Sequence, residues 1–188
     1  NDPYHRLISC SIINPQLRRQ VGPLLEVVMW HDKVPNDPEK EYATLRQLVA
    51  EESAPLDKPA IHDEISYEQN PEAKTYVMNG TTGDNIRRAA WLNYCAGVYW
   101  TYGAGPDRWM GLLNGEPIDP KDGYIQGRQW DEYGFRFFPT LFETVSALPF
   151  NTMRPRDAWL HSAPVVACLA DPARAVLVYF PKGGSAQV

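Results

Sequence analysis

The 188 residues are 44% hydrophobic and 22% charged, which is the composition of an ordinary globular domain. No apolar run reaches the roughly 20 residues that a membrane helix needs. A net charge of -5 argues against a phosphate-tracking surface, because nucleic-acid-binding proteins concentrate excess lysine and arginine. The chain is rich in aromatic residues, with six Trp and ten Tyr, and their flat faces with a hydrogen-bonding edge suit sugars. We therefore expect a carbohydrate partner, and neither a nucleic acid nor a membrane.

The first third of the chain predicts strands that alternate with a helix. Residues 7–13 and 24–30 are apolar runs with the length of buried strands. Residues 36–39 (Asn-Asp-Pro-Glu) are typical of a helix start, with a capping side chain, a proline in the first turn and an acid that the helix dipole favours. A further strand is expected at 60–64. Residues 24–65 thus indicate a parallel strand-helix-strand unit.

The same alternation is predicted once more after a long polar excursion over residues 69–83. A helix capped by Asp84 is expected at 84–96, followed by a strand at 97–103. A glycine-rich and aromatic loop comes next. The helix predicted at 130–148 starts or kinks at Pro139, because proline lacks the amide donor of a helix interior. Four parallel strands with helices between them make up half of a (β/α)8 barrel, also called a TIM barrel.

The pattern changes near residue 150. Runs rich in β-forming residues at 164–170 and 175–180, separated by a turn sequence, indicate a β-hairpin. We assign residues 1–150 to the C-terminal part of a (β/α)8 domain and 151–188 to the start of a β-sandwich domain. The fold class is therefore α/β with an appended, incomplete β-sandwich.

The three cysteines, Cys10, Cys95 and Cys168, are widely separated and lack the paired spacing of a zinc site. Each is expected to be a small buried hydrophobic residue. The sequence contains no phosphate-binding glycine loop, zincin helix or Ser-His-Asp order. We expect no metal and no cofactor.

The strand at 60–64 ends in ionisable groups. Because strand side chains alternate between faces, His62 and Glu64 should share one face, while Ile61 and Asp63 share the other. Glu64 would lie at the carboxyl end of the strand, where α/β barrels carry their catalytic residues. A solvent-exposed loop acid is the alternative, since most carboxylates are simply exposed.

Four segments, in this order and spacing, resemble a known family: residues 2–5 (Asp-Pro-Tyr-His), 58–68, 97–103 and 178–183 (Val-Tyr-Phe-Pro-Lys-Gly). The chain resembles the C-terminal half of the apiosidase-like glycoside hydrolases (DUF4038). The start of their C-terminal domain, which carries a collagen-binding label, would follow. The resemblance implies a (β/α)8 barrel whose last four strands are 7–13, 24–30, 60–64 and 98–102.

The resemblance also implies a retaining hydrolase that acts on a plant or microbial polysaccharide, with Glu64 as the nucleophile. The acid/base carboxylate belongs to an earlier strand, upstream of residue 1. The chain is therefore expected to be a fragment of a longer enzyme, inactive by itself, and secreted or periplasmic. The family usually has an Asn-Gly-like pair at positions 62 and 63, where this chain has His62 and Asp63. An acid beside the nucleophile would raise a carboxylate pKa if both faced the pocket.

Seven residues at or after the predicted strands are candidates for substrate binding. Glu68 has an alternative role in pairing with Arg87 or Arg88, and core packing is the alternative for Trp100. Trp109 is the better candidate for a platform that stacks on a sugar ring. The candidates are His5, His31, Tyr67, Glu68, Trp100, Tyr102 and Trp109.

Two other interpretations stay open. The barrel could be degenerate, so that the chain is a non-catalytic module that binds carbohydrate or protein. Alternatively, four strand-helix units could form a homodimer that closes their exposed sheet edges.

Overall fold

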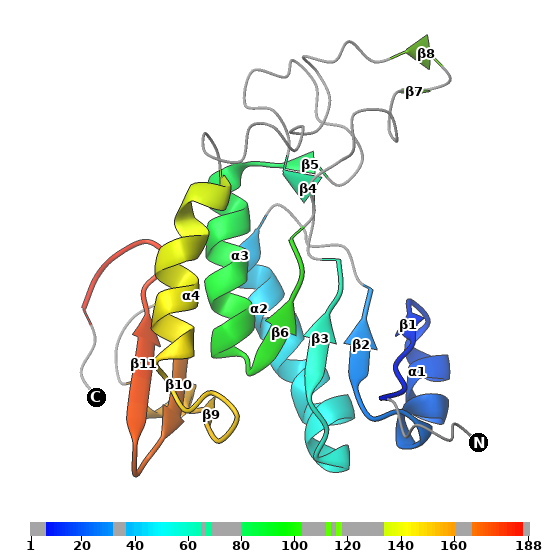
Figure 1. Ribbon diagram of the computed structural model, residues 1–188, viewed down its shortest axis with the longest axis horizontal. Coiled ribbons are helices and arrows are strands. Elements are labelled where there is room, and N and C mark those ends of the chain that lie inside the picture. Colours follow the sequence, from blue (N-terminus) through cyan, green and yellow to red (C-terminus); the bar gives the residue numbers. More distant parts are fainter. Residues whose placement is uncertain are drawn as a thin grey trace.

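The computed structural model is a mixed α/β structure built on a parallel sheet (Figure 1). It describes residues 7–31, 37–64, 67–68, 80–102, 112–113, 116–117, 134–160 and 167–185. The main sheet has four parallel strands, and strands that follow one another in the chain lie next to one another in the sheet. In sheet order these are β1 (Ser11–Ile12), β2 (Val28–Trp30), β3 (Ala60–His62) and β6 (Val98–Trp100).

Each of the three helices that connect these strands begins at a polar cap. The Asn14 side chain accepts hydrogen bonds from two backbone amides of α1 (Pro15–Val21), and Asp37 caps α2 (Pro38–Leu48) as predicted. The cap of α3 (Gly83–Cys95) is Thr82, so the prediction of Asp84 as the cap is wrong. Asp84 lies in the first turn instead, where it pairs with the guanidinium groups of Arg87 and Arg88.

Single helical turns follow α1 and α2. α2 continues without a break into one π-helical turn and then one 3-10 turn, which together carry the chain back to the start of β3. These short elements are η1 (Gly22–Leu24), η2 (Val49–Ser53) and η3 (Ala54–Leu56).

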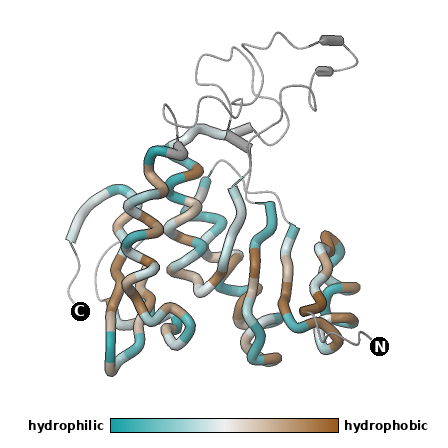
Figure 2. Tube along the Cα trace, viewed as in Figure 1, coloured by the Kyte–Doolittle hydropathy of each residue, from teal (hydrophilic) through white to brown (hydrophobic). Residues whose placement is uncertain are grey.

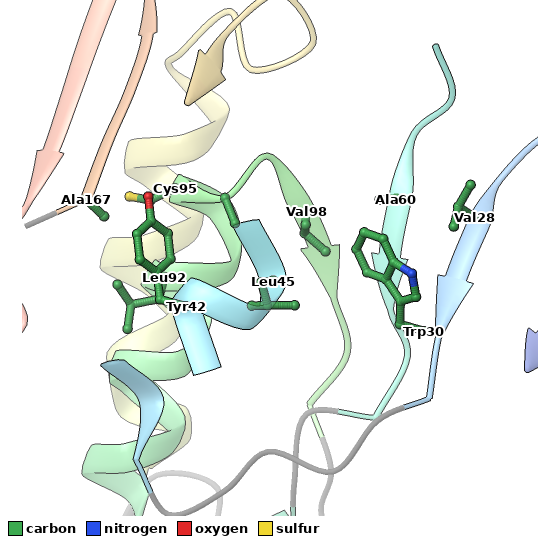
Figure 3. Packing of buried hydrophobic residues seen from close by; sticks show 10 residues of the cluster. Val28, Trp30, Tyr42, Leu45, Ala60, Leu92, Cys95, Val98 and Ala167 are labelled. Atoms are coloured by element: carbon green, nitrogen blue, oxygen red, sulfur yellow. The ribbon is translucent and has the colours of Figure 1, made fainter. Parts of the chain in front are cut away.

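The two faces of the main sheet differ in how far they are covered. Val28, Trp30, Ala60 and Val98 pack against side chains of α2 and α3 in the central core. Figure 3 shows Tyr42, Leu45 and Leu92 of these helices within that cluster. The opposite face carries the row Ser11, Met29, Ile61 and Tyr99, which is set by the strand register. None of these four is fully buried, and Tyr99 is 41% exposed. The described helices α2 and α3 therefore pack on one face of the sheet, while the residues of the opposite row stay partly exposed.

The first strand is shorter and more exposed than predicted. Only Ser11 and Ile12 of the expected run at 7–13 pair with β2, and only Ile12 is buried. Leu7, Ile8 and Ile13 are at least half exposed, which contradicts the prediction of a buried strand. Figure 2 shows the segment around β1 as largely hydrophobic, whereas α1 mixes hydrophilic and hydrophobic residues. An edge strand has no neighbour to cover its outer side, so apolar sequence alone does not bury it.

A second apolar cluster joins α3 to α4 (Phe138–Ser146), which follows η4 (Gly134–Phe137). Pro139 lies in the first turn of α4. Of the two predictions for this proline, the start of a helix is therefore correct and a kink within it is not. The rings of Phe138, Tyr94 and Trp100 pack edge to face, and Tyr102 packs on Phe138 in the same way. This aromatic cluster fixes the exit of β6 against the helices.

The predicted β-hairpin is confirmed, and it is part of a three-stranded antiparallel sheet in the order β11-β10-β9. Its turn is closed by the amide of Arg174, which donates to the carbonyl of Asp171 at 3.0 Å. The hairpin does not stand apart from the helices, because Ala167, Leu177 and Tyr179 join the central core. The elements of this sheet region are β9 (Arg154–Pro155), η5 (Asp157–Trp159), β10 (Ala167–Asp171) and β11 (Ala175–Tyr179).

Asp157 ties the antiparallel sheet to α2. Its Oδ1 accepts from the hydroxyl of Tyr42 at 2.7 Å and from the amide of Cys168 at 2.8 Å. Its Oδ2 accepts from Nε of Arg46 at 2.9 Å. One carboxylate thus joins three parts of the structure, and burial together with this contact raises the pKa of Tyr42.

A buried ion pair between α1 and η2 stabilises the part of the main sheet formed by β1 and β2. Nε of Arg18 lies 2.9 Å from Oε2 of Glu52, and both side chains are 3% exposed. The indole Nε1 of Trp30 donates to the same carboxylate oxygen at 3.0 Å. Because each charged group has partners, the pair can lie in the interior without an isolated charge.

The remaining described elements are short strand pairs: β4 (Tyr67–Glu68) with β5 (Gly80–Thr81), and β7 (Leu112–Leu113) with β8 (Glu116–Pro117). Cys95 and Cys168 are buried as predicted, whereas Cys10 is exposed, so that the prediction for Cys10 is wrong. Within the described ranges no helix is both long and apolar enough to cross a membrane.

Candidate functional site

The candidate site lies where three neighbouring parallel strands end. The strand register places Trp30, His62 and Trp100 side by side as the last residues of β2, β3 and β6. The residues that follow them, His31, Asp63 and Thr101, therefore leave the sheet at one edge. Backbone hydrogen bonds continue past the strands, from the amide of Asp63 to the carbonyl of Trp30 at 2.9 Å and from the amide of Thr101 to the carbonyl of His62 at 3.1 Å. These bonds position the site residues although no strand contains them.

His31 is the centre of the site. Its Nε2 lies 2.7 Å from Oε2 of Glu64, and its Nδ1 lies 3.2 Å from Oδ1 of Asp63. The side chains of His31, Asp63 and Glu64 are 34%, 13% and 20% exposed, respectively. The cluster is therefore shielded but still open to solvent, as a site for a soluble substrate must be.

The contacts of His31 fix what the cluster can do chemically. A neutral imidazole donates from one nitrogen only, whereas the imidazolium donates from both. Both ring nitrogens face carboxylate oxygens, so the two contacts are satisfied together when the ring is an imidazolium and both carboxylates are ionised. In that state Glu64 accepts a charge-assisted hydrogen bond from Nε2–H of His31.

The predicted alternation of side chains fails at the end of β3. Asp63 and Glu64 were expected on opposite faces, yet both contact the same imidazole. The strand ends at His62, and side chains beyond a strand do not have to alternate between its faces. The imidazole of His31 lies between the carboxylates of Asp63 and Glu64, so both acids are in the site.

His62 does not share a face with Glu64 either. It is 2% exposed and points toward the helices, where its Nδ1 lies 3.2 Å from Oδ1 of Asn93 and 3.4 Å from Oε1 of Glu41. The Asn93 amide donates to the carbonyl of Ala89 at 2.9 Å, which turns its Oδ1 toward His62. Among the described residues, the donor that contacts Glu64 is therefore His31.

Glu41 is a buried acid that sequence reasoning missed. Burial raises the pKa of its carboxyl to about 9. The 3.4 Å separation from His62 is within ion-pair distance, but its geometry is not that of a hydrogen bond, and neither carboxyl oxygen has a hydrogen-bond partner among the described residues. We therefore regard Glu41 as neutral at pH 7. Its spacing of four from Leu45, which faces the core, was the signal that could have identified it.

Two of the predicted aromatic residues lie beside the site, in the cluster that packs on α3 and α4. Trp100 contacts Tyr94 and Phe138, and its buried indole Nε1 has no hydrogen-bond partner among the described residues. Tyr102 also packs on Phe138, with ring centroids 5.0 Å apart. Contact of either ring with a substrate stays a prediction.

The remaining predicted site residues are only partly covered by the structure. Tyr67 and Glu68 form β4, which pairs in parallel with β5, but their side chains lie outside the described part. His5 and Trp109 lie outside the described residues. For the described part of the chain, no group of three or more potential metal ligands is present. His31, Asp63 and Glu64 do not make such a group, because the two carboxylates bind opposite nitrogens of one ring.

A cavity of about 350 Å³ lies at the other end of the strands. Pro59 and Gly97, which precede β3 and β6, line it together with Tyr99 and Phe150. The residues that line this cavity include none of the predicted site residues.

Comparison with known proteins gives a fold similarity. A solved structure described as a glycoside hydrolase matches this chain with a TM-score of 0.55 and 15% sequence identity. The match covers 79% of this chain and 37% of that one, so the chain spans little more than a third of the length of that protein. Neither the protein-family models nor the curated proteins gave a match. The chain therefore shares the fold of part of a glycoside hydrolase.

Proposed function

We propose that this chain is the C-terminal part of a retaining glycoside hydrolase of the apiosidase-like type (DUF4038), with Glu64 as the nucleophile. The acid/base carboxylate comes from another part of the full-length protein. The substrate is a plant or microbial polysaccharide, which implies a protein that is exported to reach it. The observation that carries the proposal is the contact between Glu64 and His31 at the carboxyl edge of a parallel sheet.

The order of the strands supports a (β/α)8 barrel. Sequence neighbours are sheet neighbours throughout β1, β2, β3 and β6, with the described helices α2 and α3 packed on one face. Doubly wound sheets instead reverse their strand order and carry helices on both faces. In a closed barrel, the uncovered row that includes Met29, Ile61 and Tyr99 would face the interior. The fold similarity to part of a glycoside hydrolase agrees with this interpretation.

The surroundings of Glu64 suit a nucleophile. A retaining enzyme needs one carboxylate that is ionised and can attack the anomeric carbon, and a second carboxyl about 5–5.5 Å away that protonates the leaving oxygen. Nε2 of His31 contacts Oε2 of Glu64, and the Glu64 side chain remains 20% exposed. Oε1 is thus the oxygen we assign to the attack.

The antiparallel sheet of β9, β10 and β11 would be the start of the C-terminal β-sandwich. Its collagen-binding label in the family is an analogy, and function is carried by sites rather than by folds. We assign this sheet no ligand.

A non-catalytic carbohydrate-binding role is the second candidate, and Asp63 favours it. Asp63 and Glu64 both contact the imidazole of His31, so that this ring joins the two carboxylates and already occupies Oε2 of Glu64. A degenerate enzyme could retain sugar binding with its carboxylate engaged in this way.

The test is to compare the full-length protein that contains these residues with its Glu64→Gln variant. Hydrolysis of aryl glycosides and branched pectic oligosaccharides should fall at least about 1,000-fold, because glutamine cannot attack as a carboxylate does. Glu143→Gln is the matched control, since Glu143 is exposed on α4 and should leave the rate unchanged.

Equal rates for the wild-type protein and Glu64→Gln would remove Glu64 from the mechanism. Tight binding of these oligosaccharides, with no turnover by the wild-type protein, would establish the binding role instead. Mass spectrometry of the protein after reaction with a slowly hydrolysed activated fluoroglycoside should find the sugar bound to Glu64 if the mechanism is retaining.

A further inference from the structure

Asp63 has no role in the proposed reaction, yet it makes a close contact in the site. It is the less exposed of the two carboxylates, at 13% against 20% for Glu64. Its backbone is held on both sides: the amide donates to Trp30, and the carbonyl accepts from the hydroxyl of Thr101. A side chain on a backbone held in this way is suited to fix the orientation of a neighbour.

The neighbour of Asp63 is the imidazole of His31. Rotation of the ring by half a turn would exchange the places of its nitrogens and carbons, so that a single contact to Glu64 would leave two ring orientations possible. The contact of Nδ1 with Asp63 at 3.2 Å removes this freedom and directs Nε2 toward Glu64. A carboxylate that accepts from Nδ1–H also selects the tautomer of a neutral histidine.

We propose that Asp63 is a positioning residue that acts on Glu64 through His31. Asp63 accepts the Nδ1 proton, and Nε2–H of the imidazolium then holds Oε2 of Glu64 and leaves Oε1 for the substrate. The catalytic part of this inference rests on the proposed function, whereas the orientation and proton arrangement of His31 do not.

The charged groups around His31 agree with this arrangement. Among the described residues, the titratable side chains in contact with it are Asp63 and Glu64, both from the segment after β3. Thr101, which directly follows β6, presents its neutral hydroxyl to the same segment. His62 and Glu41 lie toward the helices, on the other side of β3. For a neutral ring, the proposal assigns the single N–H to Nδ1, where Asp63 accepts it.

Nitrogen-15 NMR of the histidine side chains in the full-length protein, without substrate, tests the proton arrangement directly. The signals of His31 are assigned from their loss in His31→Gln. We expect Nδ1 to carry its proton in both the acidic and the alkaline spectra, and Nε2 to lose its proton between them. In Asp63→Asn the neutral ring should change to the Nε2–H tautomer that free histidine prefers. Asp57→Asn, on an exposed turn at the other end of β3, should leave the His31 signals unchanged.

Two results would overturn the proposal. One is a neutral His31 with its proton on Nε2 in the wild-type protein, and the other is an unchanged tautomer in Asp63→Asn. If that variant does not fold, the wild-type spectra alone decide. If the proposed function holds, Asp63→Asn should also lower kcat at least about tenfold with KM little changed. Absence of hydrolysis by the wild-type protein, with the expected tautomer present, would refute the proposed function and leave the positioning role of Asp63 intact.

Discussion

Two histidine-carboxylate clusters lie next to β3. One faces the helices, and the other lies beyond the carboxyl end of the strand. His62 and Glu41 are almost fully buried, and the Glu41 carboxyl is neutral because burial raises its pKa to about 9. His31, Asp63 and Glu64 keep between 13% and 34% of their side-chain surface exposed. The same residue types thus have different roles in the two clusters. Removal from water turns an acid into a neutral packing group, while partial exposure allows it to remain an ionised reactive group.

The pH dependence of stability is the strongest test of the buried cluster. The folded-state pKa of Glu41, about 9, lies above the unfolded value of 4.5, so between these limits the folded protein holds more protons than the unfolded chain. The free energy of unfolding should therefore fall as pH rises from 4.5 to 9, by at most about 1.4 kcal/mol per pH unit, and level off above that. Urea unfolding of the wild-type protein and Glu41→Gln at several pH values should show a flatter profile for the variant. Parallel profiles would show that Glu41 is ionised in the folded state.

Replacing each histidine by alanine separates the two clusters. His62→Ala should lower the free energy of unfolding by about 2–4 kcal/mol, because it leaves a cavity and an unpaired Asn93 oxygen. His31→Ala should cost less than about 1 kcal/mol, since the side chain is 34% exposed, but should reduce hydrolysis by the full-length protein. Denaturant unfolding and rate measurements on the same two variants give the comparison. A reversed order of stabilities would contradict the assignment of His62 to the core.

A small effect on stability is expected at Thr101. Thr101→Val keeps the shape of the side chain and removes the hydroxyl that donates to the carbonyl of Asp63. The loss in stability should be about 0.5–1.5 kcal/mol, as for one ordinary hydrogen bond. The informative measurement is the NMR signal of His31, which should broaden or shift as Asp63 becomes less fixed. An unchanged signal would mean that the backbone contact with Trp30 alone is sufficient.

Much of the architecture could be predicted because local signals and burial agree. The Asn-Asp-Pro-Glu start of α2 contains its own capping group, and the turn at 171–174 contains the residues that close a hairpin. The cap of α3 was harder, because Thr82 and Asp84 are both good capping residues and only the backbone conformation distinguishes them. The exposed segment at 7–10 shows the limit of predicting burial from hydrophobicity. An apolar sequence favours burial, but it does not show that a neighbouring element is present to cover it.

The site was predicted in outline and missed in detail. His31 was identified because it directly follows the apolar run at 24–30, and Glu64 because it ends the strand predicted at 60–64; strand ends of a parallel sheet meet at one edge. The orientation of Asp63 could not be predicted, since alternation ends with the strand at His62. Asn93 and Glu41 were missed because their partner, His62, is 31 and 21 residues away, respectively, and no local pattern records such a contact.

The carboxylate of Asp157 has a consequence for how the protein can be divided. Secondary structure changes from helices to strands near residue 150, yet Tyr42, Arg46 and the amide of Cys168 all depend on Asp157. A chain that stops at residue 150 would lose this partner and also the Ala167, Leu177 and Tyr179 side chains that pack against α2 and α3. We therefore expect the antiparallel sheet and the helices to melt in one cooperative transition. The unit that folds is then larger than the unit that a change of secondary structure suggests.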